Sequence, residues 1–180
     1  MTNDYSKAVK HVAWAMLLGT FHITVSGLDF LPDWVGYIMI YKALTPISRY
    51  RPTANLLKPF AAVLVVFELV NRVMKLFGMS VALYAINLII AVVYIYLNFQ
   101  LMTDIYHTAQ LFNMNSGHFI PVLRNITTVT YAMVFVVSNA GGHQYVLIAA
   151  AAVNIVMKLA LIVHLLGYSN NAGQRDMKMQ

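Results

Sequence analysis

The stretch Tyr145–Leu166 reads YVLIAAAAVNIVMKLALIVHLL and carries one charged side chain, Lys158, in 22 residues. About 20 consecutive, mainly apolar residues are enough to cross the hydrocarbon core of a bilayer as an α-helix. The segment therefore predicts a transmembrane helix and points to an integral membrane protein.

The composition of the whole chain leads to the same class. Hydrophobic residues make up 60% of the 180 residues and charged residues only 10%, against about 25% charged residues in soluble domains. This excludes a nucleic-acid-binding domain, a disordered tail and a secreted disulfide scaffold. The net charge of +6 is then typical of cytoplasmic loops that lie near anionic lipid. The absence of cysteine excludes disulfides, thiolate metal sites and cysteine nucleophiles.

Six apolar runs predict an all-α, polytopic fold with a single transmembrane domain over residues 1–180. The first run has a basic flank like that of a signal peptide, but no Ala-x-Ala-like cleavage site follows it, so we read it as an uncleaved span. The second run is short, and if it only dips into the bilayer the chain has five spans. The predicted spans are 9–28, 33–48, 60–77, 81–102, 120–138 and 145–167.

The basic residues predict the orientation. Cytoplasmic loops of membrane proteins are enriched in lysine and arginine. Six spans with both termini in the cytoplasm put nine of the twelve basic residues inside, leave Arg72 and Lys75 towards the outside, and bury Lys158. The expected location is the bacterial cytoplasmic membrane. The nine are Lys7, Lys10, Lys42, Arg49, Arg51, Lys58, Arg124, Arg175 and Lys178.

Two segments half a chain apart suggest a duplication. Residues 71–76 read NRVMKL and residues 154–159 read NIVMKL. A repeat of three spans would place its halves in opposite orientations, which is the inverted-repeat architecture of many transporters. The alternative is chance similarity in an alphabet rich in Val, Leu, Ile and Met.

The rare polar residues recur at helical spacing, so each predicted span has a polar or small-residue side. We expect these sides to face one another and to form a polar axis, with Leu, Ile and Val towards lipid. The alternative for the Asn and Thr residues is a set of modest interhelical hydrogen bonds. The residues expected to line the axis are His22, Glu68, Asn71, Arg72, Asn87, Asn98, Asn154 and Lys158.

Glu68 is the only carboxylate well inside an apolar run. A charge at the bilayer centre costs roughly 2.5–3.5 kcal/mol on insertion scales, so we expect a partner, either Arg72 four residues on or Lys158 on another helix. Glu68 and Lys158 would bind a zwitterionic or anionic solute or carry a proton; the alternative is a structural ion pair. Arg72 and Lys75 would otherwise extend to the outer interface, and a hydrogen-bonded packing role is the alternative for His22.

Asp29, Pro32 and Asp33 interrupt the hydrophobicity between the first two runs, and Trp34, Gly36 and Tyr37 follow. Asp29 and Asp33 could coordinate a cation at the outer surface. The simpler interpretation is that Pro32 and Asp33 start the second helix and Trp34 anchors it at the interface.

The segment GLDFLPDWVGYI, residues 27–38, resembles a Leu-Pro-Asp-aromatic-x-Gly-Tyr motif of small, poorly characterised integral membrane proteins from Gram-positive bacteria. There the motif joins the first two spans, and the resemblance implies no particular activity. In size and layout the chain is also similar to the substrate-binding subunits of energy-coupling-factor vitamin transporters, although the Ala-x-x-x-Ala signature of their first helix is not evident.

These features predict a protein that binds or translocates a small solute or ion along its polar axis. The alternative is a membrane-embedded subunit or regulator that docks a partner protein, or forms a homo-oligomer, through the basic loop 49–58 and the segment 104–110. An intramembrane lipid-modifying enzyme is a third hypothesis. No catalytic or phosphate-binding motif, and no spacing typical of a metal site, is present, so we expect no cofactor, no metal, no nucleic acid and no enzymatic activity.

Overall fold

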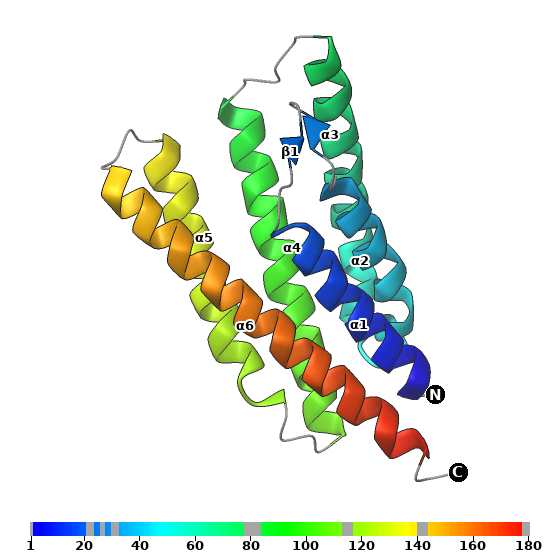
Figure 1. The fold of residues 1–180 in the computed structure, drawn as a ribbon. Coiled ribbons are helices and arrows are strands. Elements are labelled where there is room, and N and C mark those ends of the chain that lie inside the picture. The colour runs from blue at the N-terminus through cyan, green and yellow to red at the C-terminus, as the bar shows by residue number, and fades with distance from the viewer. Residues whose placement is uncertain are drawn as a thin grey trace.

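The computed structural model describes residues 2–20, 24–25, 28–29, 33–77, 84–112, 117–139 and 144–177. These residues form six α-helices: α1 (Thr2–Leu18), α2 (Asp33–Ser48), α3 (Lys58–Leu76), α4 (Tyr84–Leu111), α5 (Ile120–Asn139) and α6 (Gln144–Met177) (Figure 1). The prediction of an all-helical class is confirmed. A short 3₁₀ helix, η1 (Pro52–Leu57), leads directly into α3.

Prolines stand near the start of several helices, where the missing N–H costs nothing. Pro52 opens η1, Pro59 lies in the first turn of α3, and Pro121 lies in the first turn of α5. In α2 the first turn instead carries Asp33, whose negative charge suits the positive end of the helix dipole. The predicted role of Asp33 as the residue that starts α2 therefore matches its position.

The prediction of one continuous span over residues 9–28 is wrong for its second half. Helix α1 ends at Leu18, and β1 (Thr24–Val25) pairs antiparallel with β2 (Leu28–Asp29). The Thr20 hydroxyl donates a hydrogen bond to the carbonyl of Met16 at 2.7 Å just after the helix end. β-Branched residues such as Thr24 and Val25 favour extended backbone. Hydropathy registers only their apolar character, so it could not separate this segment from the helix.

Four helical stretches are long and apolar enough to cross a membrane: Pro52–Leu76, Ala85–Leu111, Ile120–Asn139 and Gln144–Ala172. Helices α1 and α2 are shorter, with 17 and 16 residues. The described part of the chain therefore contains several apolar helices of membrane-spanning length, and six spans stay a prediction.

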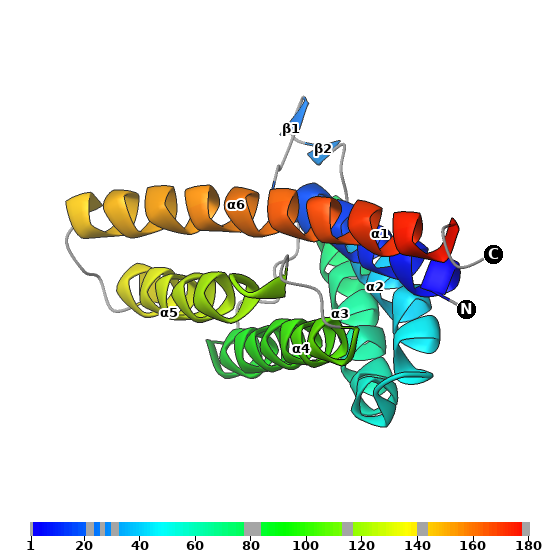
Figure 2. The ribbon, with the colours of Figure 1, turned by 90° about the horizontal axis from the view of Figure 1, so that it is seen from below.

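The six helices form a closed ring in sequence order. Each helix packs against the next one along the chain, and α6 packs back against α1; Figure 2 shows this order around the bundle. Successive helices run in opposite directions (Figure 1), so that α3 lies across the ring from α6, α2 from α5 and α1 from α4. The two ends of the chain lie at the same end of the bundle, where the Ser6 hydroxyl donates to the carbonyl of Ser169 at 2.6 Å.

The dry core is concentrated at this end, which we call the terminal end. Tyr5 and Tyr168 are fully buried there, with a ring-centroid distance of 6.3 Å. Apolar side chains from the other helices surround them, and many apolar residues nearer the opposite end of α3 and α4 are exposed. The fully buried apolar residues include Val9, Leu44, Ile47, Leu57, Leu97, Leu101, Ile105 and Leu165. The core therefore closes one end of the ring.

Candidate functional site

A cavity of about 260 Å³ lies inside the ring, and all six helices contribute to its wall. At about 30 Å³ per molecule it would hold several waters. We call it the central cavity. It is lined by Ala15, Met16, Gly19, Asp33, Gly36, Tyr37, Ile40, Glu68, Ile90, Tyr94, Asn98, Tyr131 and Lys158.

Small residues of α1 and α2 form part of the wall of the central cavity. Gly36 of α2 lies so close to α1 that an added Cβ would stand 3.0 Å from the carbonyl oxygen of Ala15. Gly19 continues the same side of α1 one turn beyond Ala15, and its own N–H donates to the Ala15 carbonyl at 3.1 Å. The close approach of α1 and α2 brings the start of α2, with Asp33, to the mouth of the cavity.

Three charged side chains line the central cavity: Asp33 from α2, Glu68 from α3 and Lys158 from α6. Since α3 and α6 lie on opposite sides of the ring, Glu68 and Lys158 approach the cavity from opposite walls. Tyr37 and Tyr131 line the same cavity as the two carboxylates, and Tyr37 stands one turn after Asp33 on α2.

An aromatic cluster on the cavity wall consists of Tyr37, Tyr94 and Tyr131, one each from α2, α4 and α5. The ring centroids of Tyr94 and Tyr131 are 4.6 Å apart, and those of Tyr37 and Tyr94 are 6.4 Å apart. The Lys158 ammonium lies 5.6 Å from the centroid of Tyr94 and 5.7 Å from that of Tyr131, within the range of a cation–π contact. The aromatic faces of this cluster therefore already accommodate one ammonium group.

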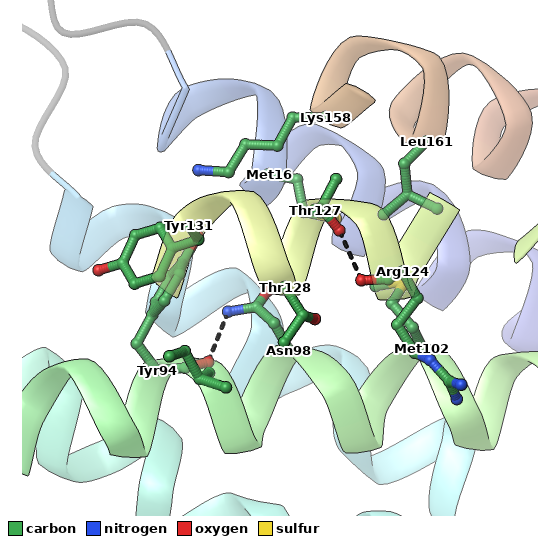
Figure 3. A pocket seen from close by; sticks show the side chains of 11 residues that line it. Met16, Tyr94, Asn98, Met102, Arg124, Thr127, Thr128, Tyr131, Lys158 and Leu161 are labelled. Atoms are coloured by element: carbon green, nitrogen blue, oxygen red, sulfur yellow. Dashed lines mark hydrogen bonds between the residues drawn. The ribbon is translucent and has the colours of Figure 1, made fainter. Parts of the chain in front are cut away.

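A second, smaller pocket of about 30 Å³ adjoins the central cavity, and Figure 3 shows the side chains that line it. The two share Met16, Tyr94, Asn98, Tyr131 and Lys158. The Asn98 amide donates to the carbonyl of Tyr94 at 2.9 Å. This pocket has room for about one or two water molecules.

Arg124 closes the far end of the small pocket. Its guanidinium donates to the Thr103 hydroxyl at 2.6 Å and to the Asn125 side chain at 2.8 Å, and it lies 4.0 Å from the ring centroid of Phe99. Polar side chains of the two pockets thus extend from Asp33 at the start of α2 to Arg124. The apolar part of the small pocket's wall consists of Met16, Ile95, Met102 and Leu161.

The structure brings part of the predicted axis together. Glu68, Asn98 and Lys158 line the central cavity, and so do Asp33, Gly36 and Tyr37 of the predicted outer-turn motif. The motif therefore supplies cavity wall as well as a helix start, and Trp34 next to it is half-buried. His22 and Pro32 lie outside the described residues, and Asp29 is described only as the β2 partner of Thr24.

The other predicted axis residues lie elsewhere. Asn154 is buried between α5 and α6, where its amide donates to the Thr127 carbonyl at 3.0 Å and the Thr130 hydroxyl at 2.7 Å. This is the alternative role, an interhelical hydrogen bond. Asn71 and Arg72 are half-buried on α3 away from the cavity wall, and Asn87 is exposed on α4.

Sequence reasoning missed Tyr94 and Tyr131 as site residues. Both stand at helical spacing with polar neighbours, Tyr94 four residues before Asn98 and Tyr131 four residues after Thr127. A tyrosine that shares a stripe with Asn or Thr inside an apolar run was the available signal.

A separate polar cluster at the terminal end surrounds Asp104, which is fully buried. Its carboxylate accepts hydrogen bonds from the Thr53 hydroxyl at 2.7 Å and the Gln100 amide at 3.1 Å, and the Arg51 Nε lies 4.0 Å away. These contacts hold η1 against α4. Asp104, which the docking hypothesis placed on the surface for a partner, instead lies inside the fold.

Within the described ranges, no group of three or more His, Cys, Asp or Glu side chains could hold a metal ion. The side chains that line the central cavity offer charge pairing, hydrogen bonding and cation–π contact. Comparisons with protein-family models, with curated proteins and with solved structures found no match to this chain.

Proposed function

We propose that this protein binds a small polar solute in the central cavity and carries it across the membrane. One observation supports the proposal above all: charged side chains from three helices line a cavity to which all six helices contribute. On insertion scales a mid-membrane charge costs roughly 2.5–3.5 kcal/mol, so Glu68 and Lys158, which lie well inside α3 and α6, would together cost about 5–7 kcal/mol before any pairing. A bundle that needed only stability would fill this space with apolar side chains.

The proposal includes six spans with both termini in the cytoplasm. Helices α1 and α2 pack within the same ring as the four long apolar helices. With 17 and 16 residues, they extend about 25 Å at 1.5 Å per residue, slightly less than the hydrocarbon thickness of about 30 Å. Local thinning of the bilayer accommodates such a mismatch at modest cost. The basic residues of the terminal end would then face the cytoplasm.

The proposal also includes a repeat of three plus three helices. The ring places α1, α2 and α3 across from α4, α5 and α6, and each opposed pair runs in opposite directions (Figure 1). The opposite directions of counterpart helices are what an inverted repeat requires, and its binding site would lie at the interface of the halves. The likeness between residues 71–76 and 154–159, on the opposed helices α3 and α6, supports it.

The absence of cysteine from the chain allows a direct test. Single-cysteine variants Asn98→Cys and Tyr131→Cys would be exposed to a membrane-impermeant, cationic thiosulfonate reagent. The reagent would be applied to right-side-out spheroplasts and, separately, to inside-out vesicles. Leu101→Cys, on α4 with Asn98 but fully buried, is the matched control.

If the cavity is hydrated and alternates between the two faces, both lining cysteines react from each side, while Leu101→Cys stays unreactive. Labelling from one face only would refute translocation but retain binding. Unreactive cysteines at both lining positions would show that water does not reach the cavity and would refute the proposal.

A further inference from the structure

We infer that the solute is a small zwitterion, whose cationic group lies at Asp33 and Glu68 and whose anionic group lies at Lys158. This inference rests on the proposed function, because it names the class of solute for the same cavity. It depends on how charge is distributed over the wall, on the aromatic cluster and on the size of the space.

Charge on the wall is divided by sign. Both carboxylates come from neighbouring helices, α2 and α3, whereas the ammonium comes from α6 on the far side of the ring. A ligand with an ammonium at one end and a carboxylate at the other matches this separation. The two carboxylates would repel an anionic ligand, and a cationic ligand would form no ion pair with Lys158.

The aromatic cluster suits the cationic end of such a ligand. Tyr37 stands one turn after Asp33 on α2 and lines the cavity together with Asp33 and Glu68. Its ring faces Tyr94 edge-on at 6.4 Å, and aromatic faces combined with carboxylates are the usual surroundings of bound ammonium groups. On the other side, the Lys158 ammonium, held over Tyr94 and Tyr131, remains available as a donor to a carboxylate.

The space limits the ligand to a small molecule. A cavity of about 260 Å³ is just below the range of roughly 300–1,000 Å³ that accommodates drug-sized ligands. It suits an amino acid or a betaine and is too small for a nucleotide or a disaccharide. The described residues also contain no cluster of metal-ligating side chains, which argues against a divalent cation.

The test uses the purified full chain in detergent and two shape-matched sets of probes. One set is radiolabelled glycine betaine, with choline as the cation and tert-butylacetate as the anion. The other is radiolabelled β-alanine, with propylamine and butyrate. Equilibrium dialysis measures binding of the zwitterions, and competition measures binding of the singly charged analogues. We expect at least one zwitterion to bind at least tenfold more tightly than both of its analogues.

Variants then assign each charge to its wall. Lys158→Met should reduce affinity for the bound zwitterion at least tenfold, to the level of its cationic analogue, whose own affinity should change little. Glu68→Gln should weaken the zwitterion and the cation together. Lys75→Met is the control, because Lys75 follows the same Val-Met sequence as Lys158 but is exposed and lies outside the cavity; its binding should equal that of the unmodified chain.

Failure of this inference is distinguishable from failure of the proposed function. If a cationic analogue binds as tightly as its zwitterion, or if no probe binds although the lining cysteines are accessible, the zwitterion assignment is refuted and a hydrated carrier remains. The comparison of probes on the unmodified chain decides the question even if a variant fails to fold. Inaccessible cysteines together with no binding would refute both.

Discussion

Replacing Asp104 by alanine should destabilise the protein far more than replacing Asp4, although both aspartates face an arginine at the terminal end. Asp104 is fully buried and accepts two hydrogen bonds, from Thr53 and Gln100. Asp4 pairs with Arg49 at 3.2 Å, but the two side chains are 62% and 58% exposed. Burial, and not the presence of an arginine, should therefore decide the size of the effect.

The magnitude follows from the contacts that each variant loses. A hydrogen bond to a charged group contributes about 1.5–3 kcal/mol, and breaking a buried charge pair costs about 3–5 kcal/mol. Because the Arg51 side chain is 35% exposed and lies 4.0 Å from the carboxylate, solvent screens part of that term. We therefore expect about 3 kcal/mol for Asp104→Ala. The exposed pair of Asp4 contributes about 0–1 kcal/mol.

Thermal unfolding in detergent, followed by the fluorescence of Trp14 and Trp34, measures the difference. A chain of this size loses roughly 2–4 °C in Tm per kcal/mol, so Asp104→Ala should unfold about 6–12 °C lower and Asp4→Ala within about 4 °C of the unmodified chain. Asp104→Asn keeps an acceptor for Thr53 and should fall in between. Equal Tm values for the two alanine variants would show that the buried cluster does not hold η1 against α4.

Four further substitutions test the packing. Gly167→Ala should stabilise the protein by up to about 1 kcal/mol in the same thermal unfolding assay, because alanine favours a helix over glycine and nothing lies within 4 Å of the new Cβ. Gly36→Ala should give no such stabilisation, because its Cβ would stand 3.0 Å from the Ala15 carbonyl oxygen. Equal stabilisation by the two substitutions would contradict that contact. Asn154→Ala should cost about 0.6–1.7 kcal/mol, the range for interhelical hydrogen bonds in membranes, and leave solute affinity unchanged; a loss of affinity without a loss of stability would return Asn154 to the binding site. Tyr168→Phe removes a hydroxyl that donates a hydrogen bond to the Tyr5 hydroxyl at 3.4 Å and should lower the free energy of unfolding by about 1 kcal/mol. An unchanged Tm would contradict this expectation.

The helical class could be predicted from the sequence because hydropathy and helical spacing both report burial in lipid. Glu68 and Lys158 could be selected for the same reason, since an ionisable group inside an apolar run has few places to lie except a protein interior. The sequence could not predict which neighbouring helix each face of a helix would contact. Asn154 and Lys158 are one turn apart on α6, yet the first bonds to α5 and the second enters the cavity.

The end of α1 and two members of the aromatic cluster, Tyr94 and Tyr131, were missed for different physical reasons. The segment after Leu18 still contains apolar residues such as Ile23 and Val25, so the hydrophobic run continues past the helix end, while its β-branched residues favour extended backbone and its Gly and Ser residues favour a turn. Tyr94 and Tyr131 come from α4 and α5, and their ring-centroid distance of 4.6 Å depends on how two helices pack. Spacing along either helix alone contains no information about that distance.

Because the ring closes only where α6 meets α1, contacts such as Ser6 with Ser169 join residues 163 positions apart. In the proposed six-span topology, the carboxylates of Asp33 and Glu68 would enter the bilayer before Lys158 is translated, because both residues precede Lys158 in the chain. A nascent chain with five helices would then carry two acidic groups in a ring that lacks α6, and the sides of α1 and α5 that contact α6 in the complete fold would face lipid. Biogenesis of such a protein should depend on a membrane chaperone or insertase that shields this intermediate until α6 arrives, and nascent chains arrested before α6 should be preferred substrates for quality-control proteases.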